Sequence, residues 1–392
     1  MTDAAAATAG SCAGTAASAM RIRTGHSYHV YFSIVIGQSN ARFVERALTP
    51  LARFLRVFKW ADAVTFVPEP GFDAIHSWNA VPLLTRRPFI VTFEDFMPRT
   101  PDDRRIAWLE RRLRDHLLSD QCVALVAISD YAMRQFSRQH EGFERLPELL
   151  AKTEVIRPVA PLRRLDPKQH SDRLKLLFVG RDFMRKGGPA LLRAHARLRR
   201  AGVSVETTIV SSLQWSRRDY IGPPDDVYVR HALDGLAAEG VTHLTEAPGG
   251  VVRDLMDRAD YLVLPTFHET FGFVTIEAMA GGTPVVATNT CVLPEIVQPG
   301  RNGFLLPFEN DPIVGKWAWI YRTADKNYLD AYEDATRRLA DSLVERMLIA
   351  FERRADFESL SAGAIATMRE RFDPATAARR LEALYGRMRR SG

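Results

Sequence analysis

Two basic residues beside a pair of glycines could hold a diphosphate. Arg181 follows an expected strand over Leu174–Gly180, and Lys186-Gly187-Gly188 leads into an expected helix over Pro189–Ala201. The start of a helix binds anions because its free amides and the positive end of its dipole point outward there. Arg181 and Lys186 would add two cations to those amides. An ordinary basic loop is the alternative interpretation.

Two glutamates, Glu269 and Glu277, form a second candidate pair eight positions apart in the segment LPTFHETFGFVTIEAMAGGTPVVATNTCVLPEIVQPGRNGF. We expect strands over Tyr261–Leu264 and Pro284–Thr288, joined through a helix over Val274–Ala280. Such a unit forms a right-handed parallel crossover, and ligands bind beyond the carboxyl ends of its strands. Glu269 then falls on the loop and Glu277 inside the helix, so both can face one crevice. The alternative is an ordinary crossover with two solvated glutamates.

The same segment resembles a known protein family. The spacing of the two glutamates, the FGF loop, the EAMA helix start, GGTPVVA, PEIV and RNGFLL together extend over about forty residues. This combination is similar to the E-x7-E motif of retaining glycosyltransferases of the GT-B fold, family 4, also described as glycosyl transferases group 1. The resemblance covers the second half of the chain well and the first half only loosely.

The resemblance implies a role for each candidate residue. Glu269 would lie beside the transferred sugar, and Glu277 would bind the ribose hydroxyls. Arg181 and Lys186 would hold the diphosphate and, with Glu269, make up the catalytic set. The other implied donor contacts are Gly37, Gly250, Val251, Gly272, Phe273 and Val274. A UDP- or GDP-sugar is the expected donor and is a substrate, so we expect no cofactor. We also expect no metal, because the positive charges are built into the chain and no Asp-x-Asp sequence is present.

Three residues of the first half are candidate contacts for the sugar or the acceptor. His76 ends an expected strand over Ala74–His76, and Glu94 and Asp95 follow an expected strand over Pro88–Phe93. Many relatives have a histidine where this chain has the two acids. The alternatives are a structural role for His76 and a helix-capping role for Glu94 or Asp95.

The expected architecture is α/β, with two Rossmann-like domains of the GT-B type facing a central cleft. A chain of 392 residues is longer than one core usually supports. We expect a disordered lead-in over 1–25, an acceptor-side domain over 26–160 and a linker over 161–172. A nucleotide-sugar domain follows over 173–373, with a helical addition at about 311–360. The last helix, 374–392, returns to the first domain. Within the first domain we expect a strand over His26–Gly37 and a helix over Arg42–Lys59.

The composition indicates the cellular compartment and the kind of partner that we expect. No run approaches the length of a membrane span, and three cysteines without metal or redox spacing suit a reducing cytoplasm. The net charge of +6 favours an anionic partner. We therefore expect a cytoplasmic protein, with possible peripheral contact to an anionic membrane at its inner face. Scattered arginines and the lack of a binding module argue against nucleic acid.

The implied function is retaining, metal-independent transfer of a sugar from a nucleoside-diphosphate sugar. The acceptor is a glycan, a lipid-linked molecule or a small molecule. Because a fold does not fix a function, three alternatives stay open: a phosphorylase, a nucleotide-sugar epimerase and a catalytically silent binding protein.

Overall fold

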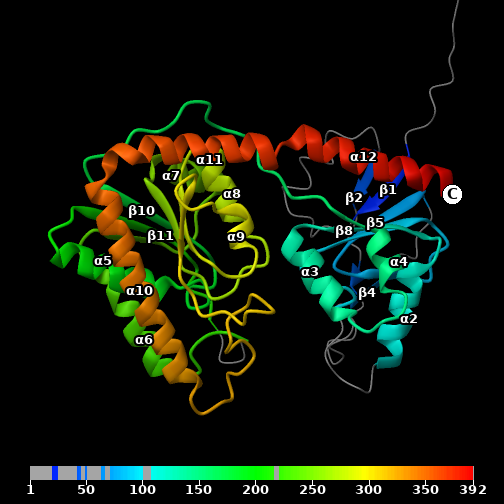
Figure 1. Cartoon of the computed structure of the whole chain (residues 1–392), viewed down its shortest axis with the longest axis horizontal. Helices are drawn as coiled ribbons and strands as arrows, with labels where there is room; N and C mark the ends of the chain where they lie inside the picture. The colour runs from blue at the N-terminus through cyan, green and yellow to red at the C-terminus, as the bar shows by residue number, and fades with distance from the viewer. Residues whose placement is uncertain are drawn as a thin grey trace, which may run out of the picture.

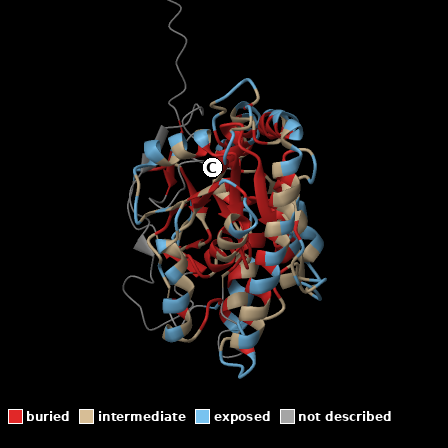
Figure 2. Cartoon of the chain, turned by 90° about the vertical axis from the view of Figure 1, so that its left-hand side faces the viewer, coloured by how far each residue is buried: buried red, intermediate tan, exposed pale blue. Residues whose placement is uncertain are grey.

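The chain folds into two α/β domains joined by a linker, and the last two helices run along the same side of both domains (Figure 1). The computed structural model describes residues 20–24, 63–66, 71–99, 107–215 and 220–391, and the backbone alone at 42–45 and 49–50. Figure 2 shows buried strands enclosed by helices whose outer faces are exposed. No helix among these residues is both long and apolar enough to cross a bilayer.

The N-terminal domain is built on a parallel sheet with the strand order β2-β1-β5-β7-β8-β9. Its strands are β1 (Arg21–Thr24), β2 (Arg42–Glu45), β5 (Ala74–Trp78), β7 (Phe89–Phe93), β8 (Cys122–Ala127) and β9 (Thr153–Val155). A small sheet of β3 (Thr49–Pro50), β4 (Val64–Phe66) and β6 (Val81–Leu83) lies beside it. The helices are α2 (Ala107–Leu118), α3 (Asp130–Gln139) and α4 (Leu146–Ala151). Helix α3 begins at Asp130, because the side chain of Ser129 accepts a hydrogen bond from the N–H of Ala132.

Two expectations for this domain are wrong. Arg21–Thr24, expected in the disordered lead-in, forms strand β1 between β2 and β5. Arg42–Glu45, expected in a helix, forms strand β2. Pairing with β1 supplies backbone hydrogen bonds that a helical spacing of apolar residues does not reveal, and tertiary context overrides weak local preference. The strand expected over His26–Gly37 lies outside the described residues.

The C-terminal domain has a second parallel sheet, with the order β12-β11-β10-β13-β14-β15. Its strands are β10 (Leu174–Val179), β11 (Val205–Val210), β12 (Val241–Leu244), β13 (Tyr261–Leu264), β14 (Val285–Thr288) and β15 (Gly303–Leu306). The helices between them are α5 (Gly188–Arg200), α6 (Asp226–Leu233) with η4 (Asp234–Ala237), α7 (Gly249–Arg258), α8 (Phe273–Ala280) and α9 (Leu293–Ile296). The strand order reverses between β10 and β13, so the loops after these two strands diverge and leave a crevice at their carboxyl ends.

The helical addition differs from its expected extent. Helix α10 (Tyr328–Glu352) begins well after residue 311, and α11 (Phe357–Arg371), reached through η5 (Arg354–Asp356), continues beyond residue 360. A connection over 307–327 precedes α10. Helix α10 packs along α5 on the outside of the C-terminal domain (Figure 1).

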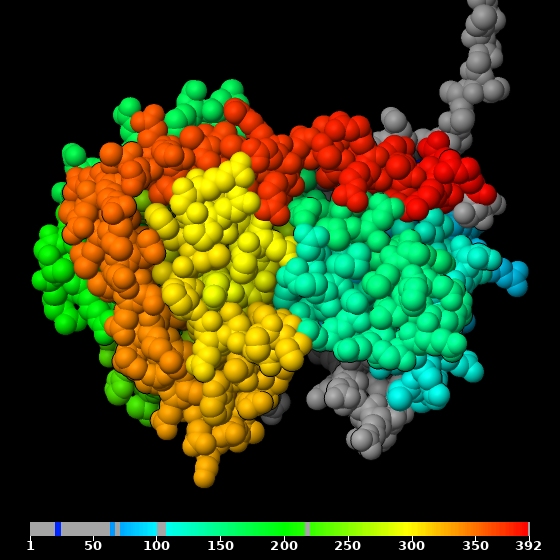
Figure 3. Space-filling view, viewed as in Figure 1, coloured from blue at the N-terminus to red at the C-terminus, as the bar shows by residue number. Residues whose placement is uncertain are grey.

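Several contacts hold the two domains together. Lys316, from the connection before α10, forms a buried ion pair with Asp95 of the N-terminal domain at 2.8 Å. Glu295 of α9 accepts hydrogen bonds from the N–H of Asp130 and from Arg134, both on α3. Helices α11 and α12 (Pro374–Ser391) run along the top of the molecule in Figure 3, α11 over the C-terminal domain and α12 over the N-terminal domain, where α12 packs on β8. The domains therefore meet on both sides of the cleft.

Candidate active site

A cleft of about 520 Å³ opens where the loops after β10 and β13 meet the N-terminal domain. It is lined by Glu94, Arg181, Asp182, Arg185, Lys186, Gln214, Trp215, Glu269, Thr270 and Phe273. Four of these residues, Glu94, Arg181, Lys186 and Glu269, are among the catalytic and sugar-contact candidates of the sequence. We call residues 180–187, which follow β10, the basic loop, and residues 265–272, which follow β13, the acidic loop. The reversal of strand order at β10 and β13 brings these two loops together in the cleft.

Two glycines shape the basic loop and let it lie against the acidic loop. Gly187 has φ +78°, and a Cβ on it would lie 1.8 Å from the carbonyl oxygen of Pro265, in the loop after β13. A Cβ on Gly188 would lie 2.1 Å from the ring of Phe183. The carbonyl oxygen of Arg185 also accepts a hydrogen bond from the N–H of Phe267 at 3.0 Å. Only glycine allows this approach, so the two loops are fixed relative to each other.

Lys186 and Glu269 form an ion pair in the cleft, with side chains 14% and 10% exposed. Burial would raise the pKa of Glu269, but the charges of Lys186 and Arg185 and a hydrogen bond from the N–H of Gly272 outweigh it and hold that pKa below its usual range. Burial also lowers the pKa of Lys186, although Glu269 opposes the shift. Glu269 is therefore held as a carboxylate beside a cation.

Arg185 is a cleft residue that sequence reasoning missed. Its Nε donates to Asp182 Oδ2 at 2.7 Å, and its Nη1 donates to the carbonyl oxygen of His268 at 3.3 Å. The signal was present in the sequence, since Arg185 lies directly before Lys186. Arg181 is exposed at the mouth of the cleft and forms no ion pair with any residue that the structure describes. The loop thus offers three cations, of which Arg181 is the least engaged.

The start of α8 forms another part of the cleft wall. Gly272 is the N-cap residue with φ +77° and gives no side-chain cap. The N–H groups of the first residues of a helix have no partner within the helix, and Phe273 and Val274 occupy these positions. Of these, Phe273 lines the cleft. Their role in donor binding stays a prediction.

Glu277 lies on α8, behind the cleft lining. Burial alone raises the pKa of its carboxyl group to about 7. None of the described residues forms a hydrogen bond or an ion pair with its carboxylate, which distinguishes it from Glu269. Its position in α8, four residues after the first residue Phe273, agrees with the expectation that it lies inside the helix, and its role stays a prediction.

Two of the three candidates in the N-terminal domain do not reach the cleft. Both ring nitrogens of His76 are engaged, one with the hydroxyl of Tyr385 on α12 and the other with Thr92 Oγ1, each at 2.8 Å. Asp95 is buried against Lys316. Neither side chain lines the cleft; each joins elements that are distant in sequence, and a sugar contact by either stays a prediction.

Glu94 is the candidate of this domain that does line the cleft. It accepts hydrogen bonds from Trp78 Nε1 at 2.9 Å and from Arg99 Nη2 at 3.1 Å. The two contacts fix its carboxylate while leaving it 19% exposed.

The remaining predicted donor contacts lie elsewhere. Gly250 and Val251 are exposed in the first turn of α7, at the same edge of the sheet but outside the cleft lining. Gly37 lies outside the described residues. Within the described ranges, no three His, Cys, Asp or Glu side chains gather as a metal site would require.

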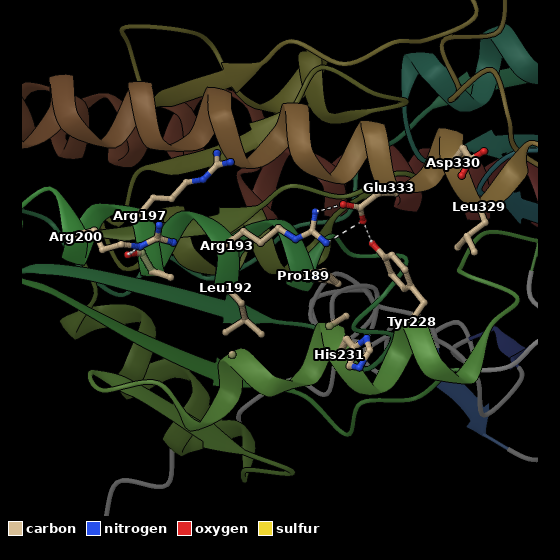
Figure 4. A pocket seen from close by; sticks show the side chains of 13 residues that line it. Pro189, Leu192, Arg193, Arg197, Arg200, Tyr228, His231, Leu329, Asp330 and Glu333 are labelled. Carbon is tan, nitrogen blue, oxygen red and sulfur yellow. Dashed lines mark hydrogen bonds and ion pairs between the residues drawn. The ribbon is translucent and has the colours of Figure 1, made fainter.

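A larger hollow of about 690 Å³ lies between α5, α6 and α10 and shares no lining residue with the cleft. Figure 4 shows that Arg193, Tyr228 and Glu333 point toward one another inside it. Glu333 accepts two hydrogen bonds from Arg193, at 2.6 and 2.8 Å, and one from Tyr228 at 2.6 Å. These three side chains are hydrogen-bonded to one another and come from three helices. The hollow is therefore a region where helices pack together through a polar contact.

Comparison with known proteins shows sequence similarity between the C-terminal domain and glycosyltransferases. Residues 173–316 match the family model described as glycosyl transferases group 1. The chain is 32% identical over 163 residues to the D-inositol 3-phosphate glycosyltransferase of Paenarthrobacter aurescens, covering 41% of this chain and 36% of that protein. It is 29% identical over 215 residues to the protein of the same name from Pseudarthrobacter chlorophenolicus, covering 53% and 48%. The chain thus spans about a third to a half of these relatives.

Solved structures extend the likeness to both domains. A glycosyltransferase from Rickettsia africae has a TM-score of 0.61 at 14% identity, covering 96% of this chain and all of that one. Anabaena HepE, solved in complex with UDP and glucose, has a TM-score of 0.57 at 15% identity, covering 94% and 99%. At such identities the likeness concerns the fold. This chain has the two-domain GT-B fold.

Proposed function

We propose that this protein is a glycosyltransferase that moves a sugar from a nucleoside-diphosphate sugar to an acceptor hydroxyl. One observation carries the proposal: Arg181, Arg185, Lys186 and Glu269 converge in a cleft between two Rossmann-like domains. The match to glycosyl transferases group 1 covers the three cations and the carboxylate. HepE, which shares the fold, was solved with UDP-glucose as well as with UDP. UDP-sugars are therefore the first donors to test.

The cleft groups suit the charges of this reaction. The bond between the anomeric carbon and the β-phosphate oxygen breaks, and its electron pair stays on the diphosphate. Arg181, Arg185 and Lys186, with the amides at the start of α8, stabilise that negative charge. Lys186 has three N–H donors, so it can keep Glu269 while meeting a phosphate oxygen.

The carboxylates have separate roles in this scheme. Glu269, held ionised, stabilises the positive charge that develops at the anomeric carbon and accepts hydrogen bonds from the sugar hydroxyls. The acceptor oxygen attacks the face that the diphosphate leaves, which retains the configuration, and its proton passes to a phosphate oxygen. Glu277 binds the ribose hydroxyls. Because the cations belong to the protein, the transfer proceeds without a metal ion.

Donor binding and product analysis test the proposal. A donor at one hundred times its dissociation constant should stabilise the protein by about 2.7 kcal/mol, so a thermal-shift panel of UDP-, GDP- and ADP-sugars identifies it. Proton NMR of the product should then show a retained anomeric configuration, and turnover should persist in excess chelator. An inverted product, or activity abolished by chelator and restored by magnesium, would contradict the respective part of the mechanism.

Variants of the two glutamates separate their roles. Glu269→Gln should lower turnover by about 10²-fold and leave UDP affinity nearly constant, because its charge acts mainly in the transition state. Glu277→Gln should weaken UDP binding by roughly 1–3 kcal/mol, because ribose is bound throughout. Calorimetric titration of UDP into both variants measures the contrast. The opposite pattern would show that the roles are reversed.

A further inference from the structure

Two tyrosines that adjoin cleft residues are partly exposed to solvent. Tyr220 is 36% exposed and Tyr321 is 62% exposed. Their ring centroids lie 5.4 Å apart, with an angle of 33° between the rings. The N–H of Tyr321 donates a hydrogen bond to the carbonyl oxygen of Tyr220 at 3.1 Å. Two distant segments, the one before α6 and the connection before α10, therefore meet in one aromatic surface.

The backbone of Tyr321 is held in an unfavourable conformation. Its φ of +66° lies in the left-handed region, which is an outlier for a bulky residue. Strain of this kind persists when the surrounding structure imposes it, and it concentrates at functional sites. The connection is fixed nearby, since Lys316 is buried against Asp95 and Asn310 pairs with Trp317 through a β-bridge. The structure thus holds the ring of Tyr321 outward.

The aromatic surface borders both walls of the cleft. On one side, the guanidinium carbon of Arg185 lies 5.9 Å from the ring centre of Tyr220. The Tyr220 hydroxyl lies 3.4 Å from Nδ1 of His268, which directly precedes Glu269. On the other side, Tyr321 belongs to the connection before α10, whose Lys316 is buried against Asp95 of the N-terminal domain. Asp95 directly follows Glu94, which lines the cleft.

We propose that Tyr220 and Tyr321 form a carbohydrate-binding platform for the acceptor at the mouth of the cleft. The proposal rests on the proposed function and names the acceptor class: a molecule that presents a sugar ring. The negative face of an aromatic ring attracts the positively polarised C–H groups on one face of a sugar. Arg185, which lies against Tyr220, offers N–H donors to the sugar hydroxyls, and its partner Asp182 offers a carboxylate.

The position of the two tyrosines and the residues around them favour a sugar-bearing acceptor. The donor diphosphate is assigned to the loops after β10 and β13, whereas Tyr321 lies on the connection whose Lys316 pairs with Asp95 of the N-terminal domain. This leaves the platform for the acceptor. An alkyl chain would be better matched by a continuous apolar surface. Here the Arg185–Asp182 pair lies against the ring of Tyr220, and a sugar can contact both an aromatic ring and a charged pair.

Binding of simple glycosides to the intact chain tests the platform. Methyl glycosides of glucose, galactose, mannose and N-acetylglucosamine are titrated by saturation-transfer NMR, with and without UDP. Tyr321→Asn removes the ring, and asparagine tolerates a positive φ, so folding is preserved. Tyr321→Phe keeps the ring without the hydroxyl. Trp108→Ala removes another exposed aromatic side chain, on α2, as the matched control.

We expect at least one methyl glycoside to bind, with affinity reduced about tenfold or more in Tyr321→Asn. Tyr321→Phe should stay within about threefold of the unmodified protein, and Trp108→Ala should not differ from it. Absence of glycoside binding, or equal binding by Tyr321→Asn, would overturn the platform. Octyl glucoside binding far more tightly than methyl glucoside, with the gain lost in Tyr321→Asn, would overturn the carbohydrate assignment in favour of an alkyl chain.

Measuring UDP binding in the same experiment distinguishes failure of this inference from failure of the proposed function. If UDP binds but none of the glycosides does, the platform fails and donor binding stands. If UDP does not bind while glycoside binding depends on Tyr321, the donor assignment fails and the platform stands.

Discussion

At the scale of single residues, the two glutamates of the acidic loop and helix have opposite electrostatic surroundings. Glu269 lies against Lys186 and near Arg185, which offset its burial and keep it ionised. Glu277 has burial alone acting on it, and its pKa of about 7 places its charge change near neutral pH. One carboxylate is therefore charged at every working pH, and the other is half-charged near pH 7.

The raised pKa of Glu277 predicts two opposite pH dependences. The folded state binds the proton more tightly than the unfolded state, so this contribution to stability is complete below about pH 4.5 and is lost as pH rises through about 7. By linkage the loss amounts to at most about 3 kcal/mol. UDP affinity should rise over the same range near pH 7, because only the carboxylate offers two full acceptors to ribose. Urea denaturation and UDP titration from pH 5 to 8 measure both effects.

Glu277→Gln provides the control for that pair of measurements. The variant does not titrate, so relative to the unmodified protein it should gain stability as pH rises, and its UDP affinity should vary less with pH. Equal pH profiles for the two proteins would show that another group is responsible.

The sequence predicted part of this site because some residues lie in local patterns. Glu269, Lys186 and Arg181 were found because each follows a strand at the edge where parallel strands end together. The partners of His76 and Asp95, which are Tyr385 and Lys316, lie 309 and 221 positions away. No local pattern reveals such a partner.

At the scale of elements, helix α10 supports both cleft loops through one residue. The hydroxyl of Tyr332 donates a hydrogen bond to the carbonyl oxygen of Met184 in the basic loop at 2.8 Å. Its ring stacks on Phe267 of the acidic loop, with centroids 4.7 Å apart and an angle of 11°. The helical addition thus contacts from behind the loops that carry Lys186 and Glu269.

Tyr332→Phe should weaken donor binding as well as stability. It keeps the ring stack but leaves the Met184 carbonyl without its donor, which costs about 1–3 kcal/mol of unfolding free energy. Release of the basic loop should lower UDP affinity several-fold. Urea denaturation and calorimetry measure the two effects.

Tyr328→Phe is the matched control, because this tyrosine is also fully buried on α10 and accepts a hydrogen bond from the N–H of Gly222 instead. It should lose similar stability with UDP affinity unchanged. If both variants bind UDP equally well, Tyr332 has no positioning role.

Several elements of the C-terminal domain could be predicted to within a residue or two, because an apolar run ends at Gly180 after β10 and at Pro265 after β13. Strand β13, for example, has the expected bounds Tyr261–Leu264. In the N-terminal domain, β1 and β2 are four residues each and are defined by pairing with each other. The extent of the helical addition was also mispredicted, since charge and helix preference do not show where a connection ends.

At the scale of the whole molecule, a buried ion pair joins the two domains beside the cleft. Lys316 is 3% exposed and Asp95 is 9% exposed, and the Lys316 ammonium group lies 4.4 Å from the ring centre of Phe96. Burial raises the pKa of Asp95 even though Lys316 opposes the shift. The neighbouring residues Val314 and Gln135 add a hydrogen bond of 2.9 Å between the domains. The pair therefore fixes the position of one domain relative to the other.

Lys316→Met should destabilise the protein in a pH-dependent way. It leaves a buried carboxylate unpaired, and breaking a buried pair typically costs about 3–5 kcal/mol. Without Lys316 the folded-state pKa of Asp95 rises further, so its protonated form stabilises the fold at low pH and this stability is lost as pH rises. The deficit relative to the unmodified protein should therefore be larger at pH 8 than at pH 5. Urea denaturation at both pH values measures it.

Adding Asp95→Asn to Lys316→Met removes the unpaired charge and should restore much of the loss at pH 8. Arg145→Met breaks the exposed Arg145–Glu148 pair, whose side chains are 49% and 55% exposed, and should change stability little, because solvent screens an exposed ion pair. If Lys316→Met behaves like Arg145→Met, or if the second substitution restores nothing, the pair does not hold the domains together. A pH-dependent loss that Asp95→Asn reverses would identify the buried charge as its cause, because a packing defect at Lys316 would persist in the double variant.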